Sequence, residues 1–344
     1  MDESLATEGG AGKPTVAICI GTYNQAQYLE GAIKSALSQT YPIREIWVSD
    51  DASTDNTDEV MKEICKKYPF LRYHRQETNL ALPGNLSWLF SQPQTEYIVR
   101  LDSDDRLEPG YVAALVEAMA MYPRAGFGHC NVYELDQHDV RTRHRQLARK
   151  HVYENGDQML TSNASGFRVA ANCILYRRDA LREVNYYLPN LAWRTCEDWD
   201  MCLRMAAAGW GNVYVGQTLS NYRVWDDEAG VRWRRKMSKV MTNISIYKNT
   251  LTAVYRERGW NTDPLQSNMR SRAIEFADAV DSPLFTAEER RQYVVLLREL
   301  GDSRGLSLAI LAAEIGLKPM IRGYVRLRVK AKDTVKGVIR GFRR

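Results

Sequence analysis

The chain has 344 residues, of which 26% are charged and 44% hydrophobic, and its formal net charge is +5. Such a composition is ordinary for a soluble globular protein, and the length is sufficient for two domains with buried cores. No uncharged apolar stretch is long enough to cross a membrane, and the acidic, Gly-rich segment 1–14 lacks the apolar core of a signal peptide. These features exclude neither an enzyme nor a binding protein, but they argue against a membrane-spanning or secreted one.

The six cysteines show no framework spacing, and several fall inside apolar runs, where a reduced core thiol is the usual explanation. We therefore expect a reducing, cytoplasmic location. The positive charge is concentrated at the end of the chain, because residues 318–344 contain ten Lys or Arg and one Asp. The chain is thus a mildly acidic body with a strongly basic tail.

The first hundred residues alternate between strand and helix patterns. Residues 15–21 read as a buried strand, and apolar residues from Leu29 to Leu37 then recur at helical spacing. The same alternation continues with strands near 45–48, 71–74 and 97–101 and helices near 60–65 and 83–90. A βαβαβαβ order predicts an α/β fold with a mostly parallel sheet covered on both faces.

The pattern changes in the second part of the chain. We predict a helix over 108–121, strands over 127–135 and 167–176, and a polar, Arg-rich mobile loop over 137–150. A helix-rich region begins near residue 230, with segments around 237–255, 269–279, 287–300 and 306–315. The sequence leaves open whether these helices serve as an acceptor platform, a dimer interface or a docking site.

Two acidic clusters follow predicted strands. Asp50, Asp51 and Asp55 come after the strand that ends at Val48, and Asp102, Ser103, Asp104 and Asp105 come after the strand that ends at Leu101. Open α/β sheets bind their ligands at the carboxyl ends of their strands, where these residues would lie. Asp50 and Asp55 fit helix capping at least as well as ligand binding.

The spacing of Asp102 and Asp104 puts two carboxylates on one side of an extended segment. Closely spaced carboxylates raise each other's pKa, and a hard divalent cation removes that cost. Oxygen ligands suit Mg²⁺ or Mn²⁺, which usually share their coordination shell with substrate phosphates. An acidic turn on the surface is the plainer explanation, but the position after a buried strand favours a metal-assisted nucleotide-phosphate site.

A third acidic cluster, Glu197, Asp198 and Asp200, begins a predicted helix. Acidic residues stabilise a helix N-terminus through the macrodipole, which would explain all three. One of them could instead act as the base that takes a proton from an acceptor hydroxyl.

Taken together, these motifs closely resemble the family 2 inverting glycosyltransferases of the GT-A fold. The resemblance rests on five ordered segments of this chain: 16–24, 35–42, 50–55, 101–105 and 197–198. It implies a Rossmann-like, mostly parallel central sheet followed by a helical C-terminal region. It also implies transfer of a hexosyl or deoxyhexosyl group from a nucleotide-diphosphate sugar to a glycan or polyprenyl-linked glycan, in cell-surface polysaccharide assembly.

The resemblance also assigns roles to individual residues. Gly21, Thr22, Tyr23 and Asp51 would contact the nucleoside, Asp102 the nucleotide and the metal, and Asp104 the metal, which is Mn²⁺ or Mg²⁺. Asp198 would be the catalytic base, with Glu197 as its supporting neighbour. The expected division is a flexible N-terminus over 1–14, a nucleotide-sugar-binding half over 15–105, an acceptor-binding and catalytic half over 106–229, a helical region over 230–317 and a basic amphipathic tail over 318–344.

Two positions depart from the pattern common in that family. Gly84 stands before Asn85 where many members have Arg, and Trp225 follows Tyr222 and Arg223 where many members have a metal-binding His nearby. Asp226 or water would then have to complete the metal shell.

The basic tail carries the last functional signal. Val335, Val338, Ile339 and Phe342 share one helical face, which predicts peripheral binding to an anionic membrane surface, such as the inner face of the plasma membrane. A solvated tail is the plainer alternative, and nucleic-acid binding is disfavoured because the tail lacks interleaved aromatic residues. Two other functions remain open, a sugar-1-phosphate nucleotidyltransferase and a non-catalytic glycan- or membrane-binding scaffold.

Overall fold

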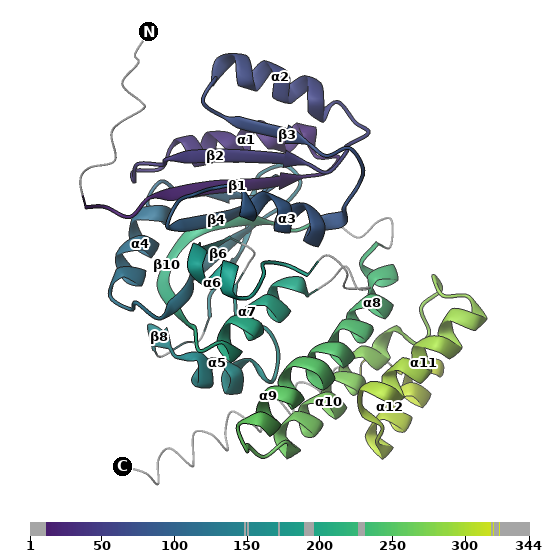
Figure 1. Ribbon diagram of the computed structural model, residues 1–344. Coiled ribbons are helices and arrows are strands. Elements are labelled where there is room, and N and C mark those ends of the chain that lie inside the picture. The colour runs from purple at the N-terminus through teal and green to yellow at the C-terminus, as the bar shows by residue number, and fades with distance from the viewer. Residues whose placement is uncertain are drawn as a thin grey trace. The chain divides into compact units, whose positions relative to one another are not determined.

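A computed structural model of the chain describes residues 12–147, 149, 151–170, 173–188, 196–225, 231–317, 319 and 323. The chain divides into two compact units, Met1–Asp226 and Asp227–Arg344 (Figure 1). The expected flexible N-terminus over 1–14 and the basic tail over 318–344 lie almost entirely outside the described residues.

One mixed sheet is the centre of the first unit. Within the described residues its strands follow the order β3-β2-β1-β4-β9-β6-β10-β5, with β7 beside β6 and β8 beside β10. Neighbours β1, β2, β3 and β4 are parallel, as are β6 and β10, whereas β9 is antiparallel to both β4 and β6. The strands are β1 (Val16–Thr22), β2 (Glu45–Asp50), β3 (Arg72–Arg75), β4 (Tyr97–Asp102), β5 (Arg106–Leu107), β6 (Ala125–Leu135), β7 (Arg141–Arg145), β8 (Tyr153–Glu154), β9 (Ile174–Arg177) and β10 (Gly211–Arg223).

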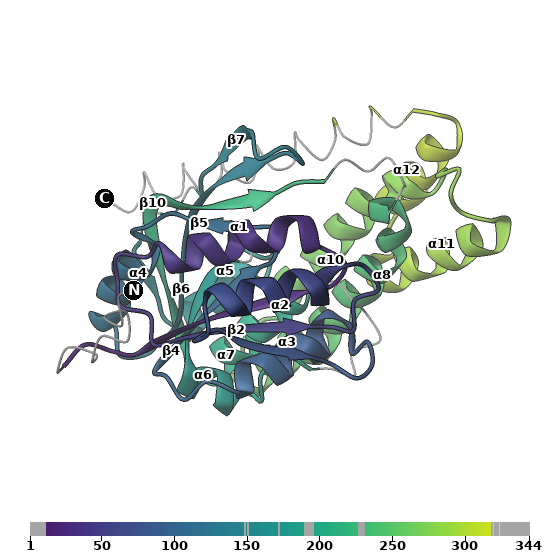
Figure 2. The ribbon, with the colours of Figure 1, turned by 90° about the horizontal axis from the view of Figure 1, so that it is seen from above.

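Helices cover both faces of this sheet, and α1 and α3 lie on opposite sides of it (Figures 1 and 2). One face packs against α1 (Ala26–Leu37), α2 (Thr57–Lys67) and α4 (Tyr111–Ala120), whose apolar residues form a single core with Ile18 and Val99 of the strands. The other face meets α3 (Ala81–Ser91), which contacts β1 and β2, and α6 (Arg178–Glu183), which contacts β6 and β9. The remaining helices are α5 (Gly156–Asn163) and α7 (Glu197–Ala207), which contact each other. The predicted α/β fold with a mostly parallel, doubly covered sheet is therefore confirmed.

Side chains of a strand alternate between the two faces, and this alternation positions the site. In β4, Val99 and Leu101 enter the core beneath α1 and α4. Arg100 and Asp102 therefore point to the opposite face.

The structure corrects the sequence prediction at three places. Part of the segment 137–150, predicted as a mobile loop, is strand β7, which pairs antiparallel with β6. The predicted strand over 167–176 is shorter and occupies only Ile174–Arg177. Strand β10, which spans Gly211–Arg223, was not predicted, although it pairs with β5, β6 and β8.

Arginine side chains explain why β7 is ordered. Arg145 donates to the carboxylate of Glu134 on β6, and the guanidinium of Arg141 lies 4.5 Å from the ring centre of Tyr133. Both partners are on β6. The arginines that make this segment look like a polar loop therefore contact side chains of the neighbouring strand.

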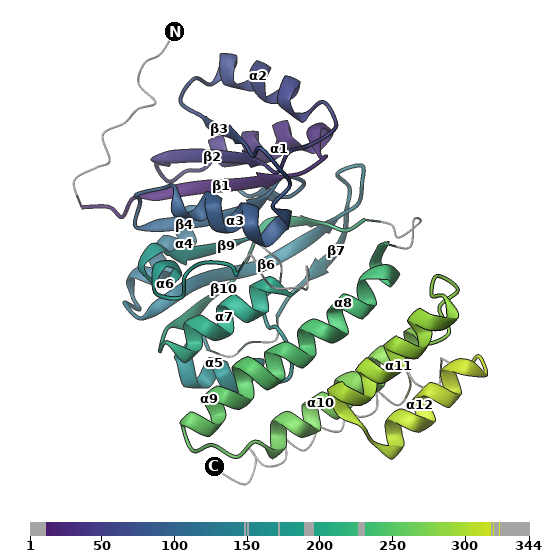
Figure 3. The ribbon, with the colours of Figure 1, turned by 45° about the vertical axis from the view of Figure 1, so that its right-hand side comes forward.

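The second unit is helical, as predicted. It contains α8 (Val231–Ser245), a π-helical segment (Ile246–Leu251), α9 (Thr252–Glu257), α10 (Asp263–Phe276), a 3₁₀ turn (Ala277–Ala279), α11 (Ala287–Gly301) and α12 (Arg304–Glu314) (Figure 3). Helix α10 packs against α11 and α12, and α11 also packs against α8. Over the described residues, no helix has both the length and the apolar character that crossing a bilayer requires.

Candidate active site

The carboxyl ends of β1, β2 and β4 bring the predicted nucleotide-binding residues together. Gly21 is in register with Ser49 on one side and with Asp102 on the other. A Cβ atom at Gly21 would lie 3.1 Å from Leu86 of α3, so the absence of a side chain lets this helix approach the strand closely. Thr22 in turn pairs with Asp50, which places both acidic strand ends beside β1.

Polar bonds connect the loops that follow β1 and β2. The side-chain oxygen of Asn24 accepts from the backbone N–H groups of Thr54 (2.7 Å) and Asp55 (3.3 Å). In return, the hydroxyl of Ser53 accepts from the backbone N–H of Asn24 at 2.9 Å. Asn24 has a φ of 53°, a left-handed conformation that Asn tolerates better than most residues. The two loops therefore form one continuous polar edge.

Asp50 and Asp55 have structural partners. Asp50 is fully buried, and its Oδ1 accepts from the backbone N–H and the hydroxyl of Ser53. Asp55 accepts from the backbone N–H of Thr57 at the start of α2 and from that of Ala26 at the start of α1. The contacts of Asp55 favour the capping alternative, whereas those of Asp50 stabilise the loop that precedes α2.

Asp51, Thr22 and Tyr23 lie together at this edge. Asp51 is 3% exposed, and its Oδ1 accepts from the backbone N–H of Leu80 at 2.7 Å. The hydroxyl of Thr22 is buried and has no hydrogen-bond partner among the described residues. Tyr23 is 46% exposed, so its ring is accessible to a planar ligand. This edge therefore offers an accessible aromatic ring and a buried hydroxyl.

Asp102 and Asp104 follow at the end of β4. Burial, and then the charge of Asp102, raises the pKa of Asp104. The indole N–H of Trp225 donates to Asp104 Oδ2 at 2.8 Å, in the region where a metal-binding His is common in the resembling family. Neighbouring Asp105 is almost completely buried, and burial and the charges of Asp104 and Asp102 raise its pKa.

These carboxylates fit a divalent cation that shares its shell with a ligand. A hard cation stabilises clustered carboxylates in the ionised form. The described residues contain no group of three or more His, Cys, Asp or Glu that could hold a metal by itself. A cation between Asp102 and Asp104 would need further oxygen ligands, such as those of a bound phosphate.

Arg100 connects this cluster to the third acidic group. It is fully buried on β4, and its Nε and Nη2 donate to the two carboxylate oxygens of Asp102 at 2.8 and 3.1 Å. Its Nη1 also donates to Oδ1 of Asp198, and Glu197 Oε1 lies 4.0 Å from Nη2. The predicted metal ligand and the predicted base thus share one guanidinium.

Asp198 has a second donor in Tyr187, whose hydroxyl lies 2.5 Å from Asp198 Oδ1. Burial raises the pKa of Asp198, while the Arg100 charge and the Tyr187 hydroxyl oppose that shift. Burial and then the charge of Asp198 raise the pKa of Glu197 to about 7. Of the two carboxylates, Asp198 is the one that accepts hydrogen bonds from both Arg100 and Tyr187, and such donors favour an ionised carboxylate.

The start of α7 presents these carboxylates. Cys196 adopts a left-handed conformation with a φ of 61°, and the helix begins at the next residue. Asp200 is tied to its own helix, because its Oδ2 accepts from Arg204 at 2.8 Å. Glu197 and Asp198 point to the cluster, whereas Asp200 has a structural partner.

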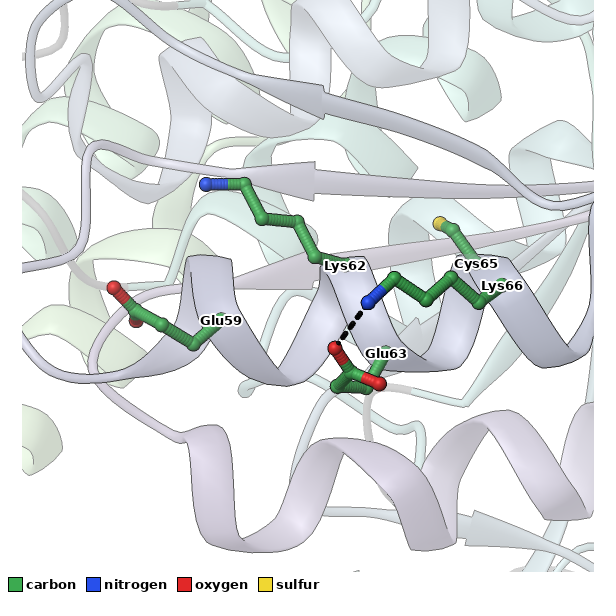
Figure 4. A pocket seen from close by; sticks show the side chains of 5 residues that line it. All are labelled: Glu59, Lys62, Glu63, Cys65 and Lys66. Carbon is green, nitrogen blue, oxygen red and sulfur yellow. Dashed lines mark hydrogen bonds and ion pairs between the residues drawn. The ribbon is translucent and has the colours of Figure 1, made fainter.

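A hollow of about 570 Å³ on the surface of α2 is a different feature (Figure 4). A single helix provides its lining residues, and an exposed ion pair joins Glu63 and Lys66 within it. It holds no converging buried groups, so it offers no alternative active site.

The sequence prediction missed Arg100 and Tyr187. Arg100 had a signal, because a lone arginine inside the apolar run from Tyr97 to Leu101 must find a partner when the strand is buried. No signal in the sequence pointed to Tyr187, because its role depends on where the segment after α6 returns to β4.

Comparison with known proteins identifies the domain. Residues 17–184 match the family model described as Glycosyl transferase family 2. This segment, just under half of the chain, is therefore similar to glycosyl transferase family 2. A Bacillus subtilis strain 168 relative, EpsE, is named as a glycosyltransferase and is 28% identical over 245 residues, which cover 68% of this chain and 81% of EpsE.

Solved glycosyltransferases share the fold. Residues 1–349 of TarS from S. aureus, in complex with UDP-GlcNAc, align with a TM-score of 0.61 and 13% identity over 91% of this chain and 92% of that one. The mannosyltransferase PcManGT from Pyrobaculum calidifontis, with GDP-Man and Mn²⁺, aligns with a TM-score of 0.54 and 12% identity over 93% of this chain and 85% of that one. At such identities the likeness shows the fold alone, and the chain has the GT-A fold expected from its sequence.

Proposed function

We propose that this chain is a family 2 glycosyltransferase, which transfers a sugar from a nucleotide-diphosphate sugar to a hydroxyl of a glycan or polyprenyl-linked glycan, with inversion, in cell-surface polysaccharide assembly. One observation carries the proposal. Arg100 binds both Asp102, at the edge where the donor phosphates would lie, and Asp198, a buried carboxylate suited to act as a base. TarS and PcManGT, which share the fold, were solved with the nucleotide sugars UDP-GlcNAc and GDP-Man, and this supports a donor of that class.

On the donor side, the nucleoside would occupy the edge formed by Gly21, Thr22, Tyr23 and Asp51. Tyr23 offers an accessible ring face for a base, and the buried hydroxyl of Thr22 offers an unused hydrogen-bonding group among the described residues. Asp102 and Asp104 would hold Mn²⁺ or Mg²⁺, which would supply the positive charge that stabilises the leaving diphosphate.

On the acceptor side, Asp198 removes the proton from the attacking hydroxyl. The acceptor oxygen forms a bond to the anomeric carbon of the sugar while the bond from that carbon to the diphosphate breaks. The proton moves to the Asp198 carboxylate, and attack opposite to the leaving group inverts the anomeric configuration. Glu197 lies 4.0 Å from Arg100, whereas Arg100 and Tyr187 both donate to Asp198, so Glu197 is the weaker candidate for this role.

The test of this mechanism is Asp198→Asn. Because Asn keeps the shape of the side chain and an oxygen for Arg100 and Tyr187, nucleotide binding should persist while transfer falls by about 10²- to 10⁴-fold. Asp200→Asn is the matched control, since it makes the same change two residues along the same helix at a carboxylate that pairs with Arg204. Transfer at wild-type rate by Asp198→Asn would remove Asp198 from the base role.

Calorimetric binding of UDP, dTDP and GDP, each with and without Mn²⁺, tests the donor class. We expect metal-dependent binding of one diphosphate. Binding of none would favour the non-catalytic scaffold, whereas formation of nucleotide sugar from a sugar 1-phosphate would favour the nucleotidyltransferase.

The basic tail supports the proposed membrane location and the proposed polyprenyl-linked acceptor. The ten basic residues in 318–344 would attract the chain to an anionic membrane, where a polyprenyl-linked acceptor resides. Co-sedimentation with vesicles that contain anionic lipid should therefore be lost when the chain is truncated before Lys318, and equal binding by both forms would contradict this assignment.

A further inference from the structure

Arg100 occupies an unusual position for a charged side chain. It is fully buried in a central strand, between the register partners Cys19 of β1 and Ile174 of β9. Burying a guanidinium is costly unless its donors are paired, and a planar guanidinium presents five N–H groups in a fixed arrangement. The protein must therefore provide several acceptors around it, and their identity indicates what the residue does.

The acceptors come from distant parts of the chain. Nε and Nη2 form a two-point contact with the carboxylate of Asp102, two residues along the same strand. Nη1 donates to Asp198 at the beginning of α7 and also approaches the Tyr187 hydroxyl at 3.1 Å. One rigid group therefore fixes the distance between the end of β4 and the first turn of α7.

Tyr187 supports the same arrangement. Its hydroxyl is within hydrogen-bonding distance of both Asp198 Oδ1 (2.5 Å) and the hydroxyl of Tyr176 (3.2 Å), and its ring packs 5.7 Å from that of Phe90 on α3. Both Arg100 and Tyr187 bind Oδ1 of Asp198. With Oδ1 engaged in this way, Oδ2 becomes the oxygen presented to an acceptor.

We propose that Arg100 is a positioning residue for sugar transfer, which holds Asp198 in register with Asp102 and directs Asp198 Oδ2 toward the acceptor hydroxyl. This inference rests on the proposed function. Arg100 itself does not touch the substrate. It sets the separation between the carboxylate that meets the donor phosphates and the carboxylate that receives the proton, and its positive charge keeps three neighbouring carboxylates compatible in one buried site.

Arg100→Lys tests the geometry, because Lys keeps the charge but cannot form the two-point contact with Asp102 while also reaching Asp198. We expect kcat for sugar transfer to fall by about a hundredfold, since a misplacement of about 1 Å is sufficient for a loss of that size. The acceptor KM should change only a few-fold. Arg272→Lys is the matched control, because Arg272 is a partly buried arginine that binds Glu275 within α10 of the second unit.

Tyr187→Phe provides a second test that preserves the packing of the ring. Removing the hydroxyl that donates to Asp198 should lower kcat by about tenfold while leaving calorimetric binding of the diphosphate with Mn²⁺ unchanged. This variant keeps the inference testable if Arg100→Lys does not fold.

The outcomes separate the two proposals. An active wild-type enzyme with a selective kcat loss in Arg100→Lys or Tyr187→Phe supports the positioning role. An active wild type whose kcat survives both changes, or falls equally in Arg272→Lys, overturns it. A wild type that neither transfers sugar nor binds any diphosphate overturns the proposed function and this inference with it.

Discussion

His129 makes the stability of the first unit depend on pH. It lies on β6 and is 1% exposed, its Nε2 is 2.9 Å from Nη1 of Arg149, and its Nδ1 has no hydrogen-bond partner among the described residues. Burial, and then the charge of Arg149, lowers the pKa of His129 to about 3. The folded protein therefore keeps this histidine neutral.

The size of the stability loss at low pH follows from the difference between the folded and unfolded pKa values of His129. An unfolded histidine titrates near 6.5, so between about pH 6.5 and the folded value the unfolded chain binds one more proton. Stability then decreases as the pH falls, by about 1.4 kcal/mol for each pH unit below 6.5. At pH 4.5 the loss is about 3 kcal/mol, which is a large part of the usual 5–15 kcal/mol of a folded domain.

Urea denaturation followed by circular dichroism at pH 7.5 and pH 4.5 measures this loss. His129→Gln keeps an acceptor for Arg149 but does not titrate, so its stability should fall by about 3 kcal/mol less than that of the wild type between the two pH values. The same substitution at His144, an exposed residue of β7, is the control and should behave like the wild type. An equal loss in His129→Gln and the wild type would refute the reasoning, because all other groups titrate alike in both.

Three further predictions concern the metal site and the helical unit. Asp104→Ala should weaken Mn²⁺-dependent diphosphate binding by at least tenfold in calorimetry while binding without metal stays the same, and undiminished metal dependence would remove Asp104 as a ligand. Trp225→Phe removes the indole N–H that donates to Asp104 Oδ2 and keeps a ring beside Tyr28. Because this oxygen is then available to the metal, Mn²⁺ affinity in the presence of the diphosphate should rise a few-fold. An unchanged affinity would show that this oxygen does not reach the metal. Gly301→Ala would place a Cβ atom 2.6 Å from the backbone of Arg270, so α10 and α11 must separate. Thermal unfolding should then report a loss of about 1–3 kcal/mol in stability. Unchanged unfolding would contradict this close packing.

Much of the fold could be predicted because its signal is local. The helix α1 follows from apolar residues at helical spacing, and four of them, Leu29, Ala32, Ile33 and Ala36, are buried as expected. Strands that end in carboxylates can also be predicted, because the apolar run and the acidic residues after it are adjacent in the sequence. These patterns describe one element and the face that it buries.

The missed strand β10 shows where such reasoning fails. Its pairing with β6 shifts register after Val215 and again after Thr218, and the intervening residues Gly216 and Gln217 are not buried. An interrupted strand gives neither a continuous apolar run nor a regular alternation. Its identity as a strand comes from its neighbours β5, β6 and β8, which the sequence order does not reveal.

The site was predictable to the extent that its chemistry sits on single strand ends. Carboxylates at 102, 104, 197 and 198 could be recognised one cluster at a time, but their roles remain proposals that the variants above test. Arg100 binds both Asp102 and Asp198, and its contact with Asp198 joins residues that are 98 positions apart along the chain. Only the return of α7 to the edge of β4 makes that connection.

The polar edge formed by Asn24, Ser53 and Thr54 has a consequence for the order of events in a catalytic cycle. Because hydrogen bonds inside the protein already fix these loops, the conformational entropy of ordering them is lost during folding and not when a nucleotide arrives. A small ligand meeting a rigid surface can bind quickly and also leave quickly. For an enzyme that must release a diphosphate after every transfer, a surface that does not close around the product would shorten the interval between turnovers.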